Sequence, residues 1–294
     1  MQNKYFIFPF LTMLFLFWGC DNEQDTNPEE ISGAFSIRIS HTVDHNSLIT
    51  NNMIYTNAAG NEYMVTEVQW FISNLKLVKA NGDMVTINDQ EGIFYIDTDV
   101  PESLLIMPAD QIPVGEYSGI AFTFGFDQEN NTSNRFVNPP ESFMFWPVYL
   151  GGGYHYLKLN GKWINQKDQL ANFNFHLGIG QLYDSTAAKS EMVDLSECCA
   201  PLHCEGYTPP SDNKILPVIE FIQNHFEVIL DNTKFSITEE RPIVLELEMK
   251  IEKWFEAPHV YDHNQWGGSI MQNQQAMQLG CENGHDVFEL NILE

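Results

Sequence analysis

The sequence predicts an all-β protein: an antiparallel β-sandwich of the immunoglobulin or jelly-roll kind, with a long cysteine-containing loop and a short C-terminal helix. Two observations lead to this class. Short runs in which apolar and polar residues alternate recur along most of the chain, and turn signals separate them. Hydrophobic residues make up 44% of the 294 residues, so one large domain can bury a sizeable core.

The N-terminal half supplies the first group of expected strands. In residues 34–41, Phe35, Ile37 and Ile39 share one face, and His41 ends the run with the same parity. An Asn-Gly-Asp turn at residues 81–83 indicates a hairpin. The strands expected after the first are residues 53–57, 64–78, 84–87, 92–97 and 118–125.

The segment 143–178 has the most unusual pattern in the chain. Trp146 and a proline are followed by three consecutive glycines, and then by a strand pattern in which His155 alternates with tyrosines. A second short strand carries His176 among phenylalanines. The glycines precede a strand and not a helix, which argues against a phosphate-binding loop.

The C-terminal third adds two strands and one helix. His225 opens an alternating strand that ends at residue 230, and residues 243–251 form another. Residues 269–279 have helical spacing, with Gly280 placed to stop the helix. Met271 and Met277 are expected to pack this helix on the sheet rather than to bind copper.

The first 33 residues are expected to lie outside the folded domain. Residues 1–19 resemble a lipoprotein signal peptide, because a short apolar run ends in a small residue directly before Cys20. Cleavage there would leave Cys20 for lipid attachment; the alternative is an ordinary signal peptide with a chance cysteine. Residues 20–33 are polar and acidic and are expected to form a flexible tether, which leaves 34–294 as a single β-sandwich domain. No later segment is apolar enough to span a membrane, so the mature protein is expected outside the cytoplasm, anchored by lipid to the outer membrane.

The remaining cysteines are expected to form two disulfides, as in other exported proteins. The long segment 184–217 holds three of them, and we expect one bridge from this segment to the fourth. The sequence leaves the pairing open, and a thiolate metal site that includes His203 is an alternative. The four residues are Cys198, Cys199, Cys204 and Cys281.

The charge balance excludes one class of function. The formal net charge is −26 at pH 7, and such a surface repels nucleic acid and anionic lipid headgroups. The sequence has no nucleophile elbow and no helical zinc-protease motif, so we expect a binding protein and not an enzyme.

Histidines on strands are the strongest candidates for a binding site. Neutral imidazole is the commonest metal ligand in proteins, and histidines that converge at one end of a sandwich would suit copper or zinc. The alternative is that these histidines are structural. The four candidates on or beside expected strands are His41, His155, His176 and His225.

Several short motifs, taken in their order, carry a family resemblance over roughly residues 34–255. They are the strand that ends in His41, YTNAAG at 55–60, VQWFISNLKL at 68–77, VGEY at 114–117, MFW at 144–146, GY with LKLNG within 153–161, and FHLG at 175–178. This order resembles the MbnP family, periplasmic or surface proteins that are associated with methanobactin and with copper-responsive methane oxidisers.

The resemblance implies a β-sandwich that binds copper. In the family, two histidines and a kynurenine made by oxidising a tryptophan hold the ion, and a di-haem enzyme of the cytochrome c peroxidase type is the implied oxidant. By position, His41 and His176 match family histidines best, His155 is a third ligand, and Trp146 is the candidate for oxidation. The chain departs from the pattern at Val148, where relatives often have a second tryptophan, and near residues 94–97, which lack a histidine that many relatives carry.

The predicted function is therefore that of a lipid-anchored copper-binding protein for copper acquisition or storage. The alternative is a cell-surface adhesion module. In that case Trp146, Tyr154 and Tyr156 would line an aromatic groove for a sugar or a peptide.

Overall fold

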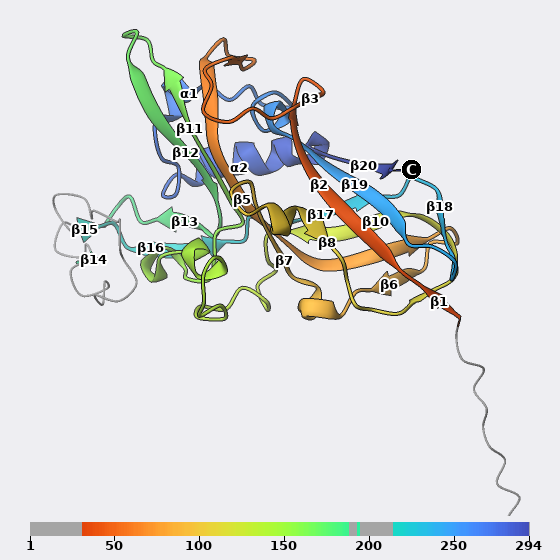
Figure 1. The fold of residues 1–294 in the computed structure, drawn as a ribbon. Coiled ribbons are helices and arrows are strands. Elements are labelled where there is room, and N and C mark those ends of the chain that lie inside the picture. The colour runs from red at the N-terminus through yellow and green to blue at the C-terminus, as the bar shows by residue number, and fades with distance from the viewer. Residues whose placement is uncertain (1–30, 188–192, 195–213, 294) are drawn as a thin grey trace, which may run out of the picture. The chain divides into compact units, whose positions relative to one another are not determined.

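Two β-sheets packed face to face form the fold, which confirms the predicted β-sandwich (Figure 1). One sheet has nine strands and the other has five, and neither closes into a barrel. The computed structural model describes residues 31–187, 193–194 and 214–293, and these belong to one compact unit. Cys20, Cys198, Cys199, His203 and Cys204 lie outside the described residues, so the predictions for them stay predictions.

The larger sheet is organised around one long central strand, β5. Its two main neighbours, β11 and β10, pair with it in antiparallel register, and the four-residue strand β7 pairs with the middle of β5 on the opposite edge. The strands of this sheet are β4 (Tyr55–Thr56), β5 (Glu62–Lys79), β6 (Met84–Thr86), β7 (Phe94–Asp97), β10 (Gly115–Phe124), β11 (Leu157–Ile164), β12 (Leu170–Leu177), β17 (Phe226–Leu230) and β18 (Phe235–Ile237).

The smaller sheet joins the two ends of the described chain. Its strands are β2 (Phe35–Val43), β3 (Asn46–Ser47), β8 (Leu105–Ile106), β19 (Ile243–Lys250) and β20 (Phe288–Leu293). β2 and β19 run parallel, side by side in Figure 1, whereas the sequence predicted a wholly antiparallel arrangement. A parallel pair needs a long connection, and all nine strands of the larger sheet lie between these two strands in the chain.

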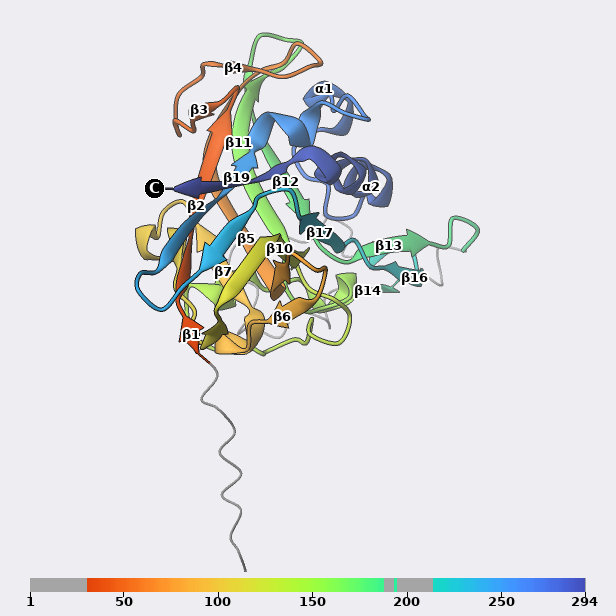
Figure 2. The same cartoon turned by 90° about the vertical axis from the view of Figure 1, so that its right-hand side faces the viewer.

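Short elements complete the described chain. α2 begins at Gln274 because the side chain of Asn273 accepts a hydrogen bond from the backbone N–H of Ala276, 3.1 Å away. The predicted helix at 269–279 is therefore real but starts later. α1 and α2 lie together beside β12 in Figure 2. The elements are β1 (Ser32–Gly33), β9 (Ile112–Pro113), β13 (Gly180–Tyr183), β14 (Val193–Asp194), β15 (Lys214–Ile215), β16 (Val218–Ile222), α1 (His263–Trp266), α2 (Gln274–Asn283), and the 3₁₀ turns η1 (Asp89–Gly92), η2 (Pro101–Leu104), η3 (Glu141–Met144), η4 (Val148–Leu150), η7 (Ile251–Phe255) and η8 (Gly284–Asp286).

The prediction that Gly280 stops the helix was wrong. Gly280 lies inside α2, where a Cβ atom would come within 2.5 Å of the ring of Phe175. Close packing of the helix on β12 therefore explains this glycine. Met277 is fully buried in the same contact region and Met271 packs against the core, as predicted.

Aromatic side chains fill the space between the two sheets. Trp70 of β5 contacts Phe288 of β20 with ring centroids 5.3 Å apart, and Phe124 of β10 lies 5.9 Å from the same phenylalanine. Full burial of one such side chain stabilises the fold by roughly 1.5–3 kcal/mol. We call the face of the larger sheet that carries Trp70 and Phe124 its inner face, and the opposite face its outer face.

Along β11 the two faces alternate without interruption. Leu157 and Leu159 are fully buried on the inner face, and Lys158 and Asn160 point to the outer face. Among the described residues, no helix has the length and apolar character needed to cross a membrane.

Candidate metal centre

His155 and His176 meet on the outer face of the larger sheet. Their ring centroids are 5.0 Å apart and the rings are nearly perpendicular. His176 lies on β12 directly across from Lys158, between Phe175 and Leu177, which face the core. His155 lies in the segment that leads into β11. The register of β11 with β12 and the segment that leads into β11 thus bring the two imidazoles to one place.

The ring of His155 is held in one orientation by a backbone carbonyl. Its Nδ1 lies 2.9 Å from the oxygen of Met144, at the end of η3. A carbonyl can only accept, so Nδ1 carries the proton and donates it. The other nitrogen, Nε2, then has its lone pair free, and it is buried without a hydrogen-bond partner among the described residues.

The ring of His176 is held by a side chain in the same way. Its Nε2 lies 2.8 Å from Oδ1 of Asn160, and Nδ2 of Asn160 donates to Glu67 at 2.9 Å. The contact with Glu67 sets the amide orientation, because a carboxylate only accepts. His176 must therefore donate from Nε2, and its Nδ1 lone pair is buried without a partner in the described part of the chain.

The two histidines thus share the arrangement that metal ligands adopt in proteins. A ligating histidine usually donates its second N–H to a carbonyl or a carboxylate, which fixes the tautomer and aims the lone pair. Buried polar atoms almost always have partners, and leaving one unpaired costs about 1–3 kcal/mol. A metal ion bound by Nε2 of His155 and Nδ1 of His176 would explain why both nitrogens are buried without a hydrogen-bond partner.

Both rings stay neutral near pH 7, as ligands must. Burial, followed by the charge of Lys158, lowers the pKa of His176 to about 3. Burial, followed by Lys158 and then His176, holds the pKa of His155 well below its usual value. Lys158 is itself anchored, since its Nζ donates to the carbonyl oxygen of Phe143 at 2.5 Å.

Trp146 packs directly against His155. Its ring centroid is 4.6 Å from that of His155, and the indole is fully buried. The indole N–H donates to the carbonyl of Leu150 at 3.0 Å. A Cβ atom at residue 178 would lie 2.7 Å from the indole ring, so Gly178 is needed for Trp146 to lie against the end of β12.

The glycine triplet gives the Trp146 segment its shape. Gly153 has a φ of 79°, a left-handed conformation that favours glycine, and its carbonyl accepts the backbone N–H of Trp146 at 2.8 Å. The turn therefore folds Trp146 back beside His155. The three glycines have a structural role in the site, and no phosphate loop is formed.

Of the four predicted histidine ligands, the structure brings together only His155 and His176. His41 lies on the other side of the larger sheet: its Nε2 accepts the indole N–H of Trp70 at 3.1 Å, and Trp70 faces inward. The alternation that placed His41 with the apolar residues of its strand directs it into the core. His41 therefore lies apart from the pair formed by His155 and His176.

His225 lies at a third place. Its ring is beside Tyr156, with centroids 6.5 Å apart, and no ring contact joins it to His155 or His176 among the described residues. Cys281, near the same strand, forms no disulfide with another described residue, and its Sγ donates to the carbonyl of Asn224 at 3.3 Å. Its predicted disulfide partners lie outside the described residues, so the bridge stays a prediction.

The predicted aromatic groove is contradicted by burial. Trp146, Tyr154 and Tyr156 are each at most 1% exposed, so none of them can offer a face to a sugar or a peptide. The adhesion alternative loses the residues on which it was based.

Sequence reasoning missed the residues that orient the histidines. Lys158 and Asn160 share the outer face of β11, directly across from His176 and diagonal to it, and such cross-strand neighbours lie within reach of each other. The alternation of apolar and polar residues predicts that Lys158 and Asn160 share one face of the strand. Only the register of β11 with β12 shows that this face also carries His176. The carbonyl of Met144 left no signal in the sequence.

A second group of possible ligands consists of oxygens. Glu67, Asp97 and Asp99 each offer a carboxylate oxygen, and these atoms lie within 4.8 Å of one another. Carboxylates suit hard cations such as calcium or magnesium. The histidine pair is the better match to copper.

A family model described as MbnP matches residues 32–272. The chain belongs to the MbnP family. The match includes His155, His176 and Trp146, and it confirms the resemblance predicted from the motifs. Membership in the MbnP family also agrees with the prediction of a binding protein and not an enzyme.

One solved structure is similar to this chain. It is MbnP from Methylosinus trichosporium, with a TM-score of 0.49 and 13% sequence identity, over 90% of this chain and 99% of that chain. A search of curated proteins gave no match.

Proposed function

We propose that this MbnP-family chain holds one copper ion between Nε2 of His155 and Nδ1 of His176. The observation that carries the proposal is the pair of buried, unpartnered lone pairs on adjacent rings, each fixed by an N–H donated elsewhere. Imidazole nitrogens are good ligands for copper, which binds N-donor sites more tightly than the other divalent ions of its row. Family membership supports a role related to copper.

Trp146 is proposed as the site of oxidation to kynurenine. Cleavage of the indole C2–C3 bond with insertion of two oxygen atoms, from dioxygen or from two molecules of hydrogen peroxide, would open the pyrrole ring. Hydrolysis by one water molecule would then release one carbon as formate, so that a ketone and an aromatic amine replace the indole. The position of the ring, 4.6 Å from His155, would put these groups beside the copper site. The catalyst we propose for this oxidation is a di-haem enzyme of the cytochrome c peroxidase type.

The proposed location is outside the cytoplasm, with the mature chain anchored through lipid on Cys20. A protein that holds copper without turning it over would serve acquisition or storage. The acidic surface would favour the approach of cations to the fold.

The test is to isolate the chain from its native host and to measure bound metals together with the intact mass. We expect one copper per chain and a mass gain of about 4 Da, the difference between tryptophan and kynurenine. Trp146→Phe should lose the mass gain and keep the histidine pair. A protein that carries no copper and takes up none on titration would overturn the proposal.

A further inference from the structure

A pocket of about 250 Å³ lies on the outer face of the larger sheet, apart from the histidine pair. The partly exposed rings of Phe136 and Tyr95 form its wall, and the fully buried ring of Phe71 packs behind them. Phe71 and Phe136 stack with centroids 5.5 Å apart and planes 10° from parallel, and Tyr95 lies 5.3 Å from Phe71. Pockets for drug-sized ligands usually span about 300–1,000 Å³, so this one is suited to a smaller molecule.

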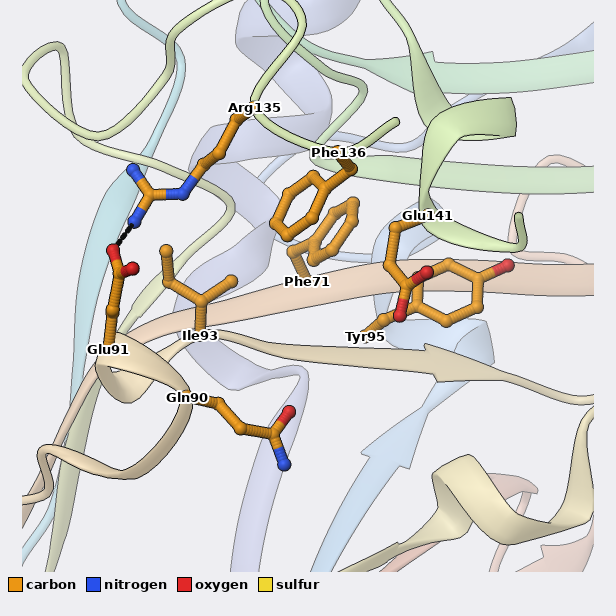
Figure 3. A pocket seen from close by; sticks show the side chains of 8 residues that line it. All are labelled: Phe71, Gln90, Glu91, Ile93, Tyr95, Arg135, Phe136 and Glu141. Atoms are coloured by element: carbon orange, nitrogen blue, oxygen red, sulfur yellow. Dashed lines mark hydrogen bonds and ion pairs between the residues drawn. The ribbon is translucent and has the colours of Figure 1, made fainter. Parts of the chain in front are cut away.

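The pocket has one carboxylate with no partner. In the part of the chain that the structure describes, the side chain of Glu141 makes no hydrogen bond and no ion pair, although it is half-buried. Figure 3 shows its carboxylate on the same side of the pocket as Tyr95, next to the stacked rings of Phe71 and Phe136. A cation placed between a carboxylate and an aromatic face is attracted by the negative charge of the carboxylate and by the negative face of the ring.

The other charges of the pocket are already paired. Arg135 and Glu91 form an ion pair at the opposite side in Figure 3, and the Arg135 side chain is only 20% exposed. The hydroxyl of Tyr95 donates to Asp97 at 2.6 Å and so is not available to a ligand. The lining thus offers one unpaired negative charge, that of Glu141, and no unpaired positive charge.

We propose that this pocket binds a small organic ammonium ion, with the cation between Glu141 and the partly exposed rings of Phe136 and Tyr95. The aromatic rings favour a ligand with apolar groups, and the carboxylate of Glu141 favours a ligand with a positive charge. An organic anion is a poor ligand because the pocket has no unpaired positive charge. A hydrated metal ion is a poor ligand because the pocket offers it only one unpaired carboxylate. This site is separate from the proposed copper site and can fail or succeed independently of it.

The test is a calorimetric or NMR titration of the intact protein with choline and with its uncharged isostere 3,3-dimethylbutan-1-ol, at constant ionic strength. We expect choline to bind and to shift signals of Phe136 and Tyr95, and the alcohol to bind at least tenfold more weakly. Glu141→Gln should weaken choline binding about tenfold, and Phe136→Leu should weaken it by a similar factor.

Glu239→Gln is the matched control, because it removes one exposed surface charge outside the pocket. It should leave choline binding unchanged. The proposal is overturned if the alcohol binds as well as choline, if choline does not bind, or if Glu239→Gln and Glu141→Gln have the same effect. The last result would mean general attraction to the acidic surface.

Discussion

At the scale of single residues, the site depends on which nitrogen of each histidine carries the proton. Met144 and Asn160 decide this for His155 and His176, and neither of them would touch the ion. Asn160 is decisive for His176 because Glu67 fixes its amide. The function of the site therefore rests on neighbours that the histidine pattern alone does not reveal.

Asn160→Ala tests this dependence. Without the amide oxygen, the N–H of His176 loses its acceptor and the ring is free to change tautomer, so we expect copper affinity to fall roughly 10- to 100-fold. A competition titration with a copper chelator measures the effect. Asn172 is exposed and lies on the same face of β12 as His176, four residues earlier in the strand. Asn172→Ala should therefore leave the affinity unchanged. Equal effects of the two variants would contradict the role given to Asn160.

At the scale of elements, alternation was enough to predict most of the strands. The apolar and polar positions of β2, β5, β10, β17 and β19 are visible in the sequence and correspond to the two faces in the structure. The parallel pairing of β2 with β19 could not be predicted, because it depends on contacts between residues far apart in the chain.

The same limit explains the outcome for the candidate site. His176 and His155 stood in a segment with unusual composition, so the sequence found them, and Trp146 with them. His41 was included because it ends a strand, although its parity with the apolar residues already placed it on the core face. The hydrogen bond from Trp70 shows what it contacts there. The contribution of η3 was hidden, because a four-residue 3₁₀ turn has no periodic pattern.

η3 also connects two parts of the outer face. Its first residue, Glu141, lines the aromatic pocket, and its last, Met144, holds His155 through its carbonyl. The carbonyl of Phe143 between them accepts the Lys158 ammonium. One short element therefore positions groups in both proposed sites.

At the scale of the whole molecule, several buried histidines make stability depend on pH. Burial lowers the pKa of His41 to about 4, against about 6.5 in an unfolded chain. Between these two values the unfolded chain binds more protons than the folded one, so the stability falls as pH falls from 6.5 toward 4. The large negative net charge acts in the opposite sense, since protonation of surface carboxylates relieves repulsion.

A comparison with His41→Gln separates the two effects. A glutamine oxygen can still accept the indole N–H of Trp70, but it does not titrate. We expect the loss of unfolding free energy between pH 7 and pH 5, measured on metal-free protein by urea denaturation, to be about 2 kcal/mol smaller in the variant. The same pH dependence in both proteins would show that His41 is not buried as a neutral ring.

The most direct test of the copper site is a competition titration of metal-free protein with His176→Ala and His41→Ala measured side by side. Both variants remove one of the predicted strand histidines, but only His176 has a buried, unpartnered lone pair on a ring 5.0 Å from that of His155. We predict that His176→Ala loses high-affinity copper binding and that His41→Ala, once shown to be folded, still binds one copper ion with an affinity near that of the parent. Loss of binding in folded His41→Ala, with binding kept in His176→Ala, would contradict the site described for this chain.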